Sequence, residues 1–240
     1  MSELPFIKHF TELRKRFFII IIFWTLFTCI SLYFYSYLIS FFIAPFLNIK
    51  TLLPHSLYLS TLFEGFFTKL KCCMIFGFIL SLPIIIFHVF RFILPGLKKK
   101  ERFFIISLLV PAVFLSVFSI FYMYKLVIPF TIPFLTSINF VPVNTGVMLN
   151  FHDSVFYILQ FLFISAILFQ FPVVIVLILY FKFFSVKQLF FFSRYMFVII
   201  VILAAILTPP DIISQLTLSM PLIFMYFIAL FIGFIFKLGK

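Results

Sequence analysis

The chain has 240 residues and a net charge of +12; 65% of its residues are hydrophobic, 23% are aromatic and only 10% are charged. A water-soluble domain is about half apolar and about a quarter charged, so this composition excludes a water-soluble fold, and the high hydrophobicity also excludes a disordered chain. We expect one domain, residues 1–240, dissolved in a lipid bilayer, with basic residues that mark one side of the membrane instead of a nucleic-acid interface.

Six apolar runs predict membrane-spanning helices, since a helix needs roughly 20 apolar residues to cross about 30 Å of hydrocarbon. The sequence predicts an all-α integral membrane protein with six transmembrane helices over residues 17–42, 66–94, 103–124, 154–181, 195–208 and 212–236. The fifth run offers only 13 uninterrupted apolar residues before a Pro-Pro turn, so short fifth and sixth helices are expected. A re-entrant hairpin is the alternative for this segment.

The Lys and Arg residues predict the orientation of the bundle. Loops on the cytoplasmic side carry an excess of Lys and Arg, so both termini are expected on the cytoplasmic side or, in an organelle, the matrix side. The 14 basic residues that this topology places there are Lys8, Arg14, Lys15, Arg16, Arg91, Lys98, Lys99, Lys100, Arg102, Lys182, Lys187, Arg194, Lys237 and Lys240.

Prolines within four of the predicted spans indicate a curved bundle. Each removes a backbone donor and tends to kink its helix, so we expect a concave bundle around a hollow. These prolines are Pro83, Pro111, Pro172 and Pro221. The outer segments 43–65 and 125–153 are rich in Pro and aromatic residues and are expected to hold short helices on the membrane surface.

Glu12 and Glu101 are isolated carboxylates on the cationic inner side. Glu12 has the spacing of an i,i+4 partner of Arg16, and Glu101 that of a first-turn acid in the third helix. The alternative is a binding role, because a carboxylate accepts an arginine side chain through two parallel hydrogen bonds. Two such carboxylates suit a ligand that presents two arginines.

A second polar group lies at the turn between the fifth and sixth helices. Asp211 can cap the sixth helix, but the short fifth helix would place this turn below the membrane surface. There a second membrane helix would be the natural partner of the polar residues Thr208, Asp211, Ser214 and Gln215.

The sequence contains no pattern for catalysis. It has no HExxH, no Gly-x-Ser-x-Gly and no phosphate-binding glycine loop, so no catalytic residue, cofactor or metal is expected. His88 lies near Arg91 and is interpreted as a helix-capping group. Cys29, Cys72 and Cys73 are interpreted as small buried apolar residues.

Four ordered blocks resemble the TatC family, the six-helix subunit of the twin-arginine protein translocase. They are residues 9–16 (HFTELRKR), 63–71 (FEGFFTKLK), 92–102 (FILPGLKKKER) and 207–215 (LTPPDIISQ). The resemblance extends over nearly the whole chain. It implies a receptor for folded precursors whose signal peptides carry an Arg-Arg pair, in a system that uses the proton-motive force without ATP.

The resemblance also implies roles for individual residues. Glu12 and Glu101 would contact the two arginines, with Arg14, Phe92 and Pro95 shaping that surface. The single helix of a TatA- or TatB-type partner would bind at Thr208, Pro209, Asp211 and Gln215, in a complex that contains several copies of the chain. Pro45, Glu64 and Gln170 match further family positions; many relatives carry Glu where this chain has Gln170.

From the residues alone, Gln170 either bonds to carbonyls freed by Pro172 or faces a guest helix. The 44 Phe residues resemble organelle-encoded members of the family, so we expect the mitochondrial inner membrane, with a bacterial inner membrane or a plastid thylakoid membrane as alternatives. Two other functions stay open: a proton-coupled transporter of small solutes and an assembly scaffold for membrane complexes.

Overall fold

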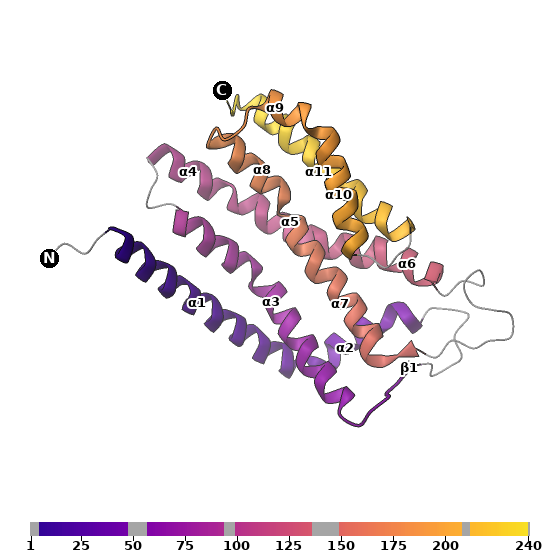
Figure 1. Cartoon of the computed structure of the whole chain (residues 1–240). Helices are drawn as coiled ribbons and strands as arrows, with labels where there is room; N and C mark the ends of the chain where they lie inside the picture. Colours follow the sequence, from indigo (N-terminus) through magenta and orange to yellow (C-terminus); the bar gives the residue numbers. More distant parts are fainter. Residues whose placement is uncertain (1–4, 48–56, 94–98, 136–148, 208–211, 240) are drawn as a thin grey trace.

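The computed structural model describes residues 5–47, 57–93, 99–135, 149–207 and 212–239, and these are almost entirely helical (Figure 1). Within them, five helical segments are long and apolar enough to cross a membrane, and two shorter apolar helices accompany them. The fold class predicted from the sequence, an all-α membrane bundle, is confirmed.

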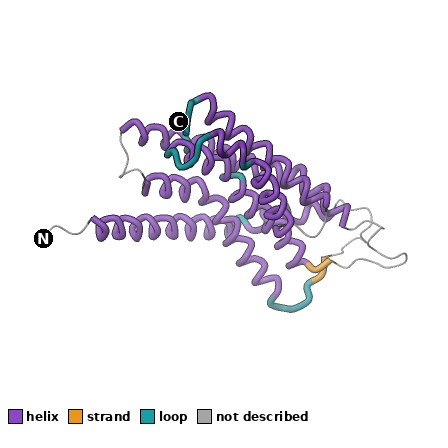
Figure 2. The backbone as a smooth tube through the Cα atoms, turned by 45° about the horizontal axis from the view of Figure 1, so that its top comes forward, coloured by secondary structure: helices purple, strands orange, loops and turns teal. Residues whose placement is uncertain are grey.

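Helix α1 (Pro5–Tyr33) lies at the edge of the bundle and packs along α3 (Glu64–Ile93) (Figures 1 and 2). The two backbones approach closely at Gly77, where an added Cβ would lie 2.7 Å from the backbone nitrogen of Thr28. Nearby, the indole Nε1 of Trp24 donates to the carbonyl of Met74 at 2.9 Å. A residue without a side chain at position 77 therefore sets the distance between these helices.

The burial of Cys72 and Cys73 and the exposure of Cys29 follow from this arrangement. Cys72 and Cys73 on α3 are fully buried, as predicted. Cys29 is exposed, so its predicted burial is wrong. The reason is that α1 is covered mainly by α3, which leaves most of its apolar side chains on the outside of the bundle.

The first span ends earlier than the predicted residue 42. Helix α1 stops at Tyr33, and α2 (Tyr35–Leu47) takes a new direction after Phe34 (Figure 1). No Pro or Gly lies at this break. The apolar run continues through it because α2 also contributes to the core, where Phe42 is fully buried. Helix α2 is thus a short outer helix that begins before the segment where one was expected.

The third span is longer than predicted. Helices α4 (Lys99–Ser107), α5 (Leu109–Tyr122) and α6 (Ile128–Leu135) follow one another, with the π-helical turn η2 (Met123–Val127) between the last two. A π-helical turn inserts an extra residue without ending a helix. Lys125, which the sequence places at the start of an outer loop, therefore lies within a helix.

The fourth span matches its prediction closely and bends in the middle. Helix α7 (Phe151–Leu168) begins at the cap residue Asn150, whose Oδ1 accepts from the backbone N–H of Asp153 at 3.0 Å. Helix α8 (Phe171–Tyr180) follows after two residues, with Pro172 in its first turn, where a missing N–H is tolerated.

The last two spans form a hairpin of unequal arms. The six-residue α9 (Val186–Phe191) leads into α10 (Ser193–Leu207), which has 15 residues, and α11 (Ile212–Ile235) has 24. The short fifth helix is therefore confirmed. The sixth helix, α11, is shorter than α3, which has 30 residues, but α11 is still long enough to cross a membrane.

Both ends of the described chain lie at one end of the bundle, together with the starts of α4 and α9, as Figures 1 and 2 show. Helices α2 and α6 lie at the opposite end (Figure 1), where β1 (Leu57–Tyr58) pairs in parallel with β2 (Leu149–Asn150). The predicted placement of both termini on one side is confirmed. We call the end with the two termini the inner end, because most of the basic residues belong to the segments at that end, and we call the opposite end the outer end.

Three of the four prolines within the predicted spans line one apolar cavity of about 550 Å³. Pro111 of α5, Pro172 of α8 and Pro221 of α11 each contribute to its wall. The expected hollow is therefore present. It lies between α5, α8 and α11, because helices that are kinked at proline cannot pack against each other along their full length.

Candidate functional site

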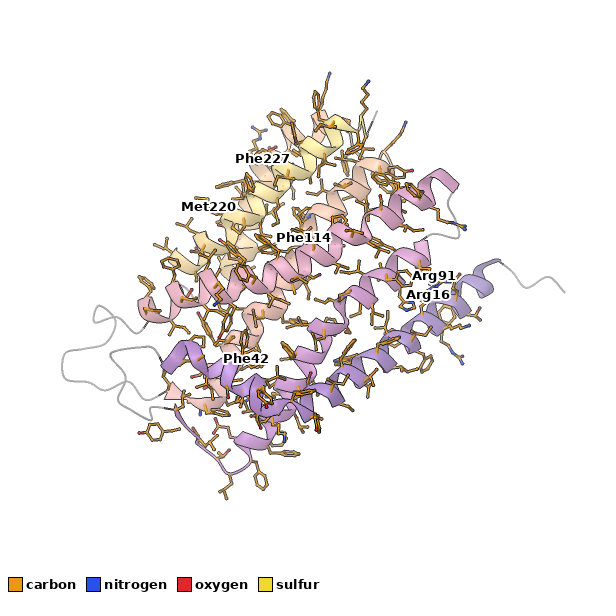
Figure 3. The ribbon with its side chains drawn as sticks, turned by 180° about the vertical axis from the view of Figure 1, so that it is seen from behind. Arg16, Phe42, Arg91, Phe114, Met220 and Phe227 are labelled. Carbon is orange, nitrogen blue, oxygen red and sulfur yellow. The ribbon has the colours of Figure 1, made fainter. Side chains whose placement is uncertain are left out.

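A polar cavity of about 510 Å³ opens between α1 and α3 at the inner end. It contains Glu12, one of the two carboxylates predicted to bind arginine. The full set of lining residues is Thr11, Glu12, Lys15, Arg16, Ile19, His88 and Arg91. Figure 3 shows Arg16 and Arg91 next to each other on these two helices.

Glu12 forms an ion pair with Arg16 one helical turn later, through Oε1 and a guanidinium N–H. The i,i+4 partner that the spacing predicts is therefore present. The side chain of Glu12 is still 32% exposed, against 14% for Arg16. The carboxylate thus keeps an accessible face while it is held by the chain's own arginine.

The other residues of the predicted inner site are placed only in part. Arg14 is exposed on α1, and Phe92 is half-buried near the end of α3. The backbone of Glu101 lies in α4, which begins at the inner end like α1 (Figure 1), but its side chain lies outside the described part. Pro95 also lies outside the described residues.

His88 was interpreted as a helix-capping group, but its ring nitrogen Nδ1 makes no capping hydrogen bond to the described residues. The atom is buried and has no hydrogen-bond partner among the described residues, and the same is true of Nε of Arg16. This pair could not be predicted from the sequence, because Arg16 and His88 are 72 positions apart and meet only when α1 packs on α3.

The predicted site for a partner helix lies mostly beyond the described residues. Thr208, Pro209 and Asp211 are outside them. Gln215 is half-buried on α11, and its Nε2 donates to the carbonyl of Val201 on α10 at 3.2 Å. This bond joins the two arms of the short hairpin and uses one of the two donors of the amide.

Glu64 organises the outer end of the bundle. It is the first residue of α3, and its Oε2 accepts from the backbone N–H groups of Ser60 and of Thr61, the latter at 3.1 Å. The side chain of Asn150 donates to the Ser60 hydroxyl at 2.7 Å, which links this turn to the start of α7. Pro45, the other matched outer position, is half-buried within α2.

Gln170 joins the fourth span to the third. Its Nε2 donates to Oγ of Ser116 at 2.8 Å and to the carbonyl of Ala112 at 3.2 Å, both on α5. Of the two interpretations, the hydrogen bonds favour a structural one, but the acceptors are on a neighbouring helix and are not carbonyls freed by Pro172.

The chain matches the family model described as Sec-independent protein translocase protein (TatC) over residues 8–221. The chain belongs to the TatC family. It is 31% identical to an uncharacterised tatC-like protein of Gracilaria tenuistipitata var. liui, with 94% of this chain and 92% of that one covered. It is also 31% identical to the Sec-independent protein translocase protein TatC of Escherichia coli (strain K12), with 95% and 87% covered.

A crystal structure of the twin arginine translocase receptor TatC has the same fold as this TatC-family chain. The TM-score is 0.81 at 28% sequence identity, and the comparison covers 94% of this chain and 99% of the other. The similarity therefore extends over nearly the whole chain and is not limited to the motif blocks.

Proposed function

We propose that this TatC-family chain is the receptor subunit of a twin-arginine protein translocase, which binds the Arg-Arg signal peptides of folded precursors at its inner end. The main support is the similarity to the twin arginine translocase receptor over nearly the full length of both chains. The accessible carboxylate of Glu12 in an otherwise cationic inner cavity supports the proposed position of the site.

Binding at Glu12 would proceed by exchange of one guanidinium for another. At about 4 Å and an effective dielectric constant near 20, a guanidinium–carboxylate contact is worth about 4 kcal/mol before desolvation. Arg16 already makes such a contact, so a guest arginine gains only the difference between its own geometry and that of Arg16. Specificity for a signal peptide then comes from its second arginine, which we propose binds Glu101. The surface formed by Arg14, Phe92 and Pro95 adds to this specificity.

We assign the outer turn, at Thr208, Pro209, Asp211 and Gln215, to the single helix of a TatA- or TatB-type partner. The physical argument is depth: α10 has 15 residues, about 22 Å at 1.5 Å per residue, which is shorter than the ~30 Å of hydrocarbon in a bilayer, so we expect the polar residues that follow it to lie below the membrane surface. Polar groups at that depth are costly unless they are paired. Transport would be driven by the proton-motive force, and several copies of the chain would assemble with the partners.

The mitochondrial inner membrane is the proposed location, based on the Phe-rich composition; the alternatives are a bacterial inner membrane and a plastid thylakoid membrane. Localisation of a tagged chain by immunogold labelling distinguishes these membranes.

The experiment that tests the receptor function is crosslinking of the inserted chain to a labelled precursor. Glu12→Gln and Glu101→Gln keep the shape of the side chain and remove its charge, so each is expected to reduce the crosslink strongly while the protein stays inserted. Asp153→Asn is the matched control, since Asp153 is an exposed acid at the start of α7, at the outer end. Unchanged crosslinking in both inner variants would refute the proposal.

A further inference from the structure

We infer that the inner cavity between α1 and α3 is a binding site for a phosphate-type oxyanion. This inference does not depend on the binding of signal peptides, because it concerns the cationic wall of the cavity and not Glu12. Lys15, Arg16 and Arg91 supply three positive charges to the lining, and Glu12 supplies the single carboxylate.

The charges of this cavity are not balanced by the chain itself. Glu12 is already bound to Arg16. Arg91 lies over the ring of Phe87, 5.8 Å from its centroid, and makes no ion pair among the described residues. Figure 3 shows Arg91 beside Arg16, so two guanidinium groups face one cavity. Such an arrangement is repulsive unless an anion lies between them.

Two buried polar atoms of the lining also lack partners within the described part of the chain. They are Nε of Arg16 and Nδ1 of His88. Buried polar groups are almost always hydrogen-bonded, so a pair of unsatisfied atoms around one polar cavity indicates a ligand with acceptor oxygens. Nε of Arg16 is a donor, and His88 is one as well in the tautomer that carries the proton on Nδ1.

The geometry and the depth of the cavity favour a phosphate group among anions. A guanidinium binds phosphate through two parallel hydrogen bonds, and a tetrahedral anion with several oxygens can accept from Arg16, Arg91 and His88 together. The cavity lies where the apolar part of α1 begins, and Ile19, from that apolar part, is one of its lining residues. A basic pocket between two membrane helices, next to the start of an apolar span, is a typical binding site for an anionic lipid headgroup.

The test is a calorimetric titration of the full chain, purified in a non-ionic detergent at fixed ionic strength. Two probes are used: inorganic phosphate, and a short-chain phosphatidic acid below its micelle concentration. The variant is Arg91→Gln, on the exposed rim of the cavity, and the control is Arg102→Gln, which removes an exposed cation from α4 at the same end.

We expect saturable binding that becomes about tenfold weaker in Arg91→Gln, the effect of one lost charge-assisted hydrogen bond, and that stays unchanged in Arg102→Gln. Binding of inorganic phosphate would show that a free oxyanion is sufficient to occupy the site, and binding of the phosphatidic acid alone would identify the ligand as a lipid headgroup. If neither probe shows saturable binding, or if Arg91→Gln and Arg102→Gln weaken binding equally, the inference is overturned.

Discussion

Glu12 and Arg16 are joined by an ion pair across one turn of α1, and this pair determines how the inner site can work. The carboxylate is held in place by a partner that a guest arginine must displace. The cost of displacement is small, because ion pairs that are partly exposed contribute about 0.2–1 kcal/mol. The pair therefore orients Glu12 without blocking it.

Removal of the internal partner is expected to favour a guest arginine. In Arg16→Gln, Glu12 loses its competitor, and an Arg-Arg signal peptide should bind about two- to fivefold more tightly, the equivalent of the pair's free energy. Fluorescence anisotropy with a labelled peptide measures this change. A loss of affinity as large as that in Glu12→Gln would contradict the exchange of one guanidinium for another.

The close approach of α1 and α3 predicts a large effect of a single methyl group. In Gly77→Ala, the added Cβ would lie 2.7 Å from the backbone nitrogen of Thr28 and 2.9 Å from its Cα, so the helices must move apart. We expect a loss of about 1–3 kcal/mol in the free energy of unfolding, seen as a lower melting temperature in detergent.

Gly65→Ala is the matched control, because its Cβ would meet only the side chain of Leu59, at 3.8 Å. This variant should melt like the parent. Equal melting of the two variants would mean that α1 does not contact α3 as described.

The hydrogen bond between Gln170 and Ser116 is expected to hold the third and fourth spans together. Gln170→Leu should lower the free energy of unfolding by about 1–3 kcal/mol, because the buried hydroxyl of Ser116 loses its donor. A double-mutant cycle with Ser116→Ala isolates the pair, and its coupling energy should be clearly positive. A coupling near zero would show that the amide has another role, such as contact with a guest helix.

Gln215 is expected to affect the assembly and not the binding of signal peptides. Gln215→Leu removes the bond to Val201 and the second amide donor, so it should reduce co-purification of a single-span partner and leave peptide affinity unchanged. Met220→Leu, on the exposed side of the same helix, serves as the control. If the partner is recovered in equal amounts from both variants, the outer turn is not its binding site.

The apolar runs predicted the six helices well, but they did not predict where the first and third spans end. Phe34 separates α1 from α2 inside an apolar run. Hydrophobicity does not reveal this break, because the apolar residues continue into α2, which also contributes to the core. Lys125 is an exposed charged residue within the π-helical turn η2. Neither site contains a Pro or a Gly, and the charge of Lys125 indicated a loop where the structure has a helix.

The candidate site shows the same division between local and distant contacts. The pairing of Glu12 with Arg16 was predictable, since four residues make one helical turn. The meeting of Arg16 with His88 and Arg91 was not, because it depends on how α1 packs on α3, two helices that are far apart in the sequence and approach closely at Gly77.

The central claim is that carboxylates at the inner end receive the paired arginines of a signal peptide. Its most direct test is a photocrosslinking residue at position 101, with labelled precursors that carry either Arg-Arg or Lys-Lys. Lysine offers a point charge without the two-pronged geometry of arginine, so we expect a strong crosslink with Arg-Arg and a much weaker one with Lys-Lys. Equal crosslinks with the two precursors, or none with either, would contradict the claim.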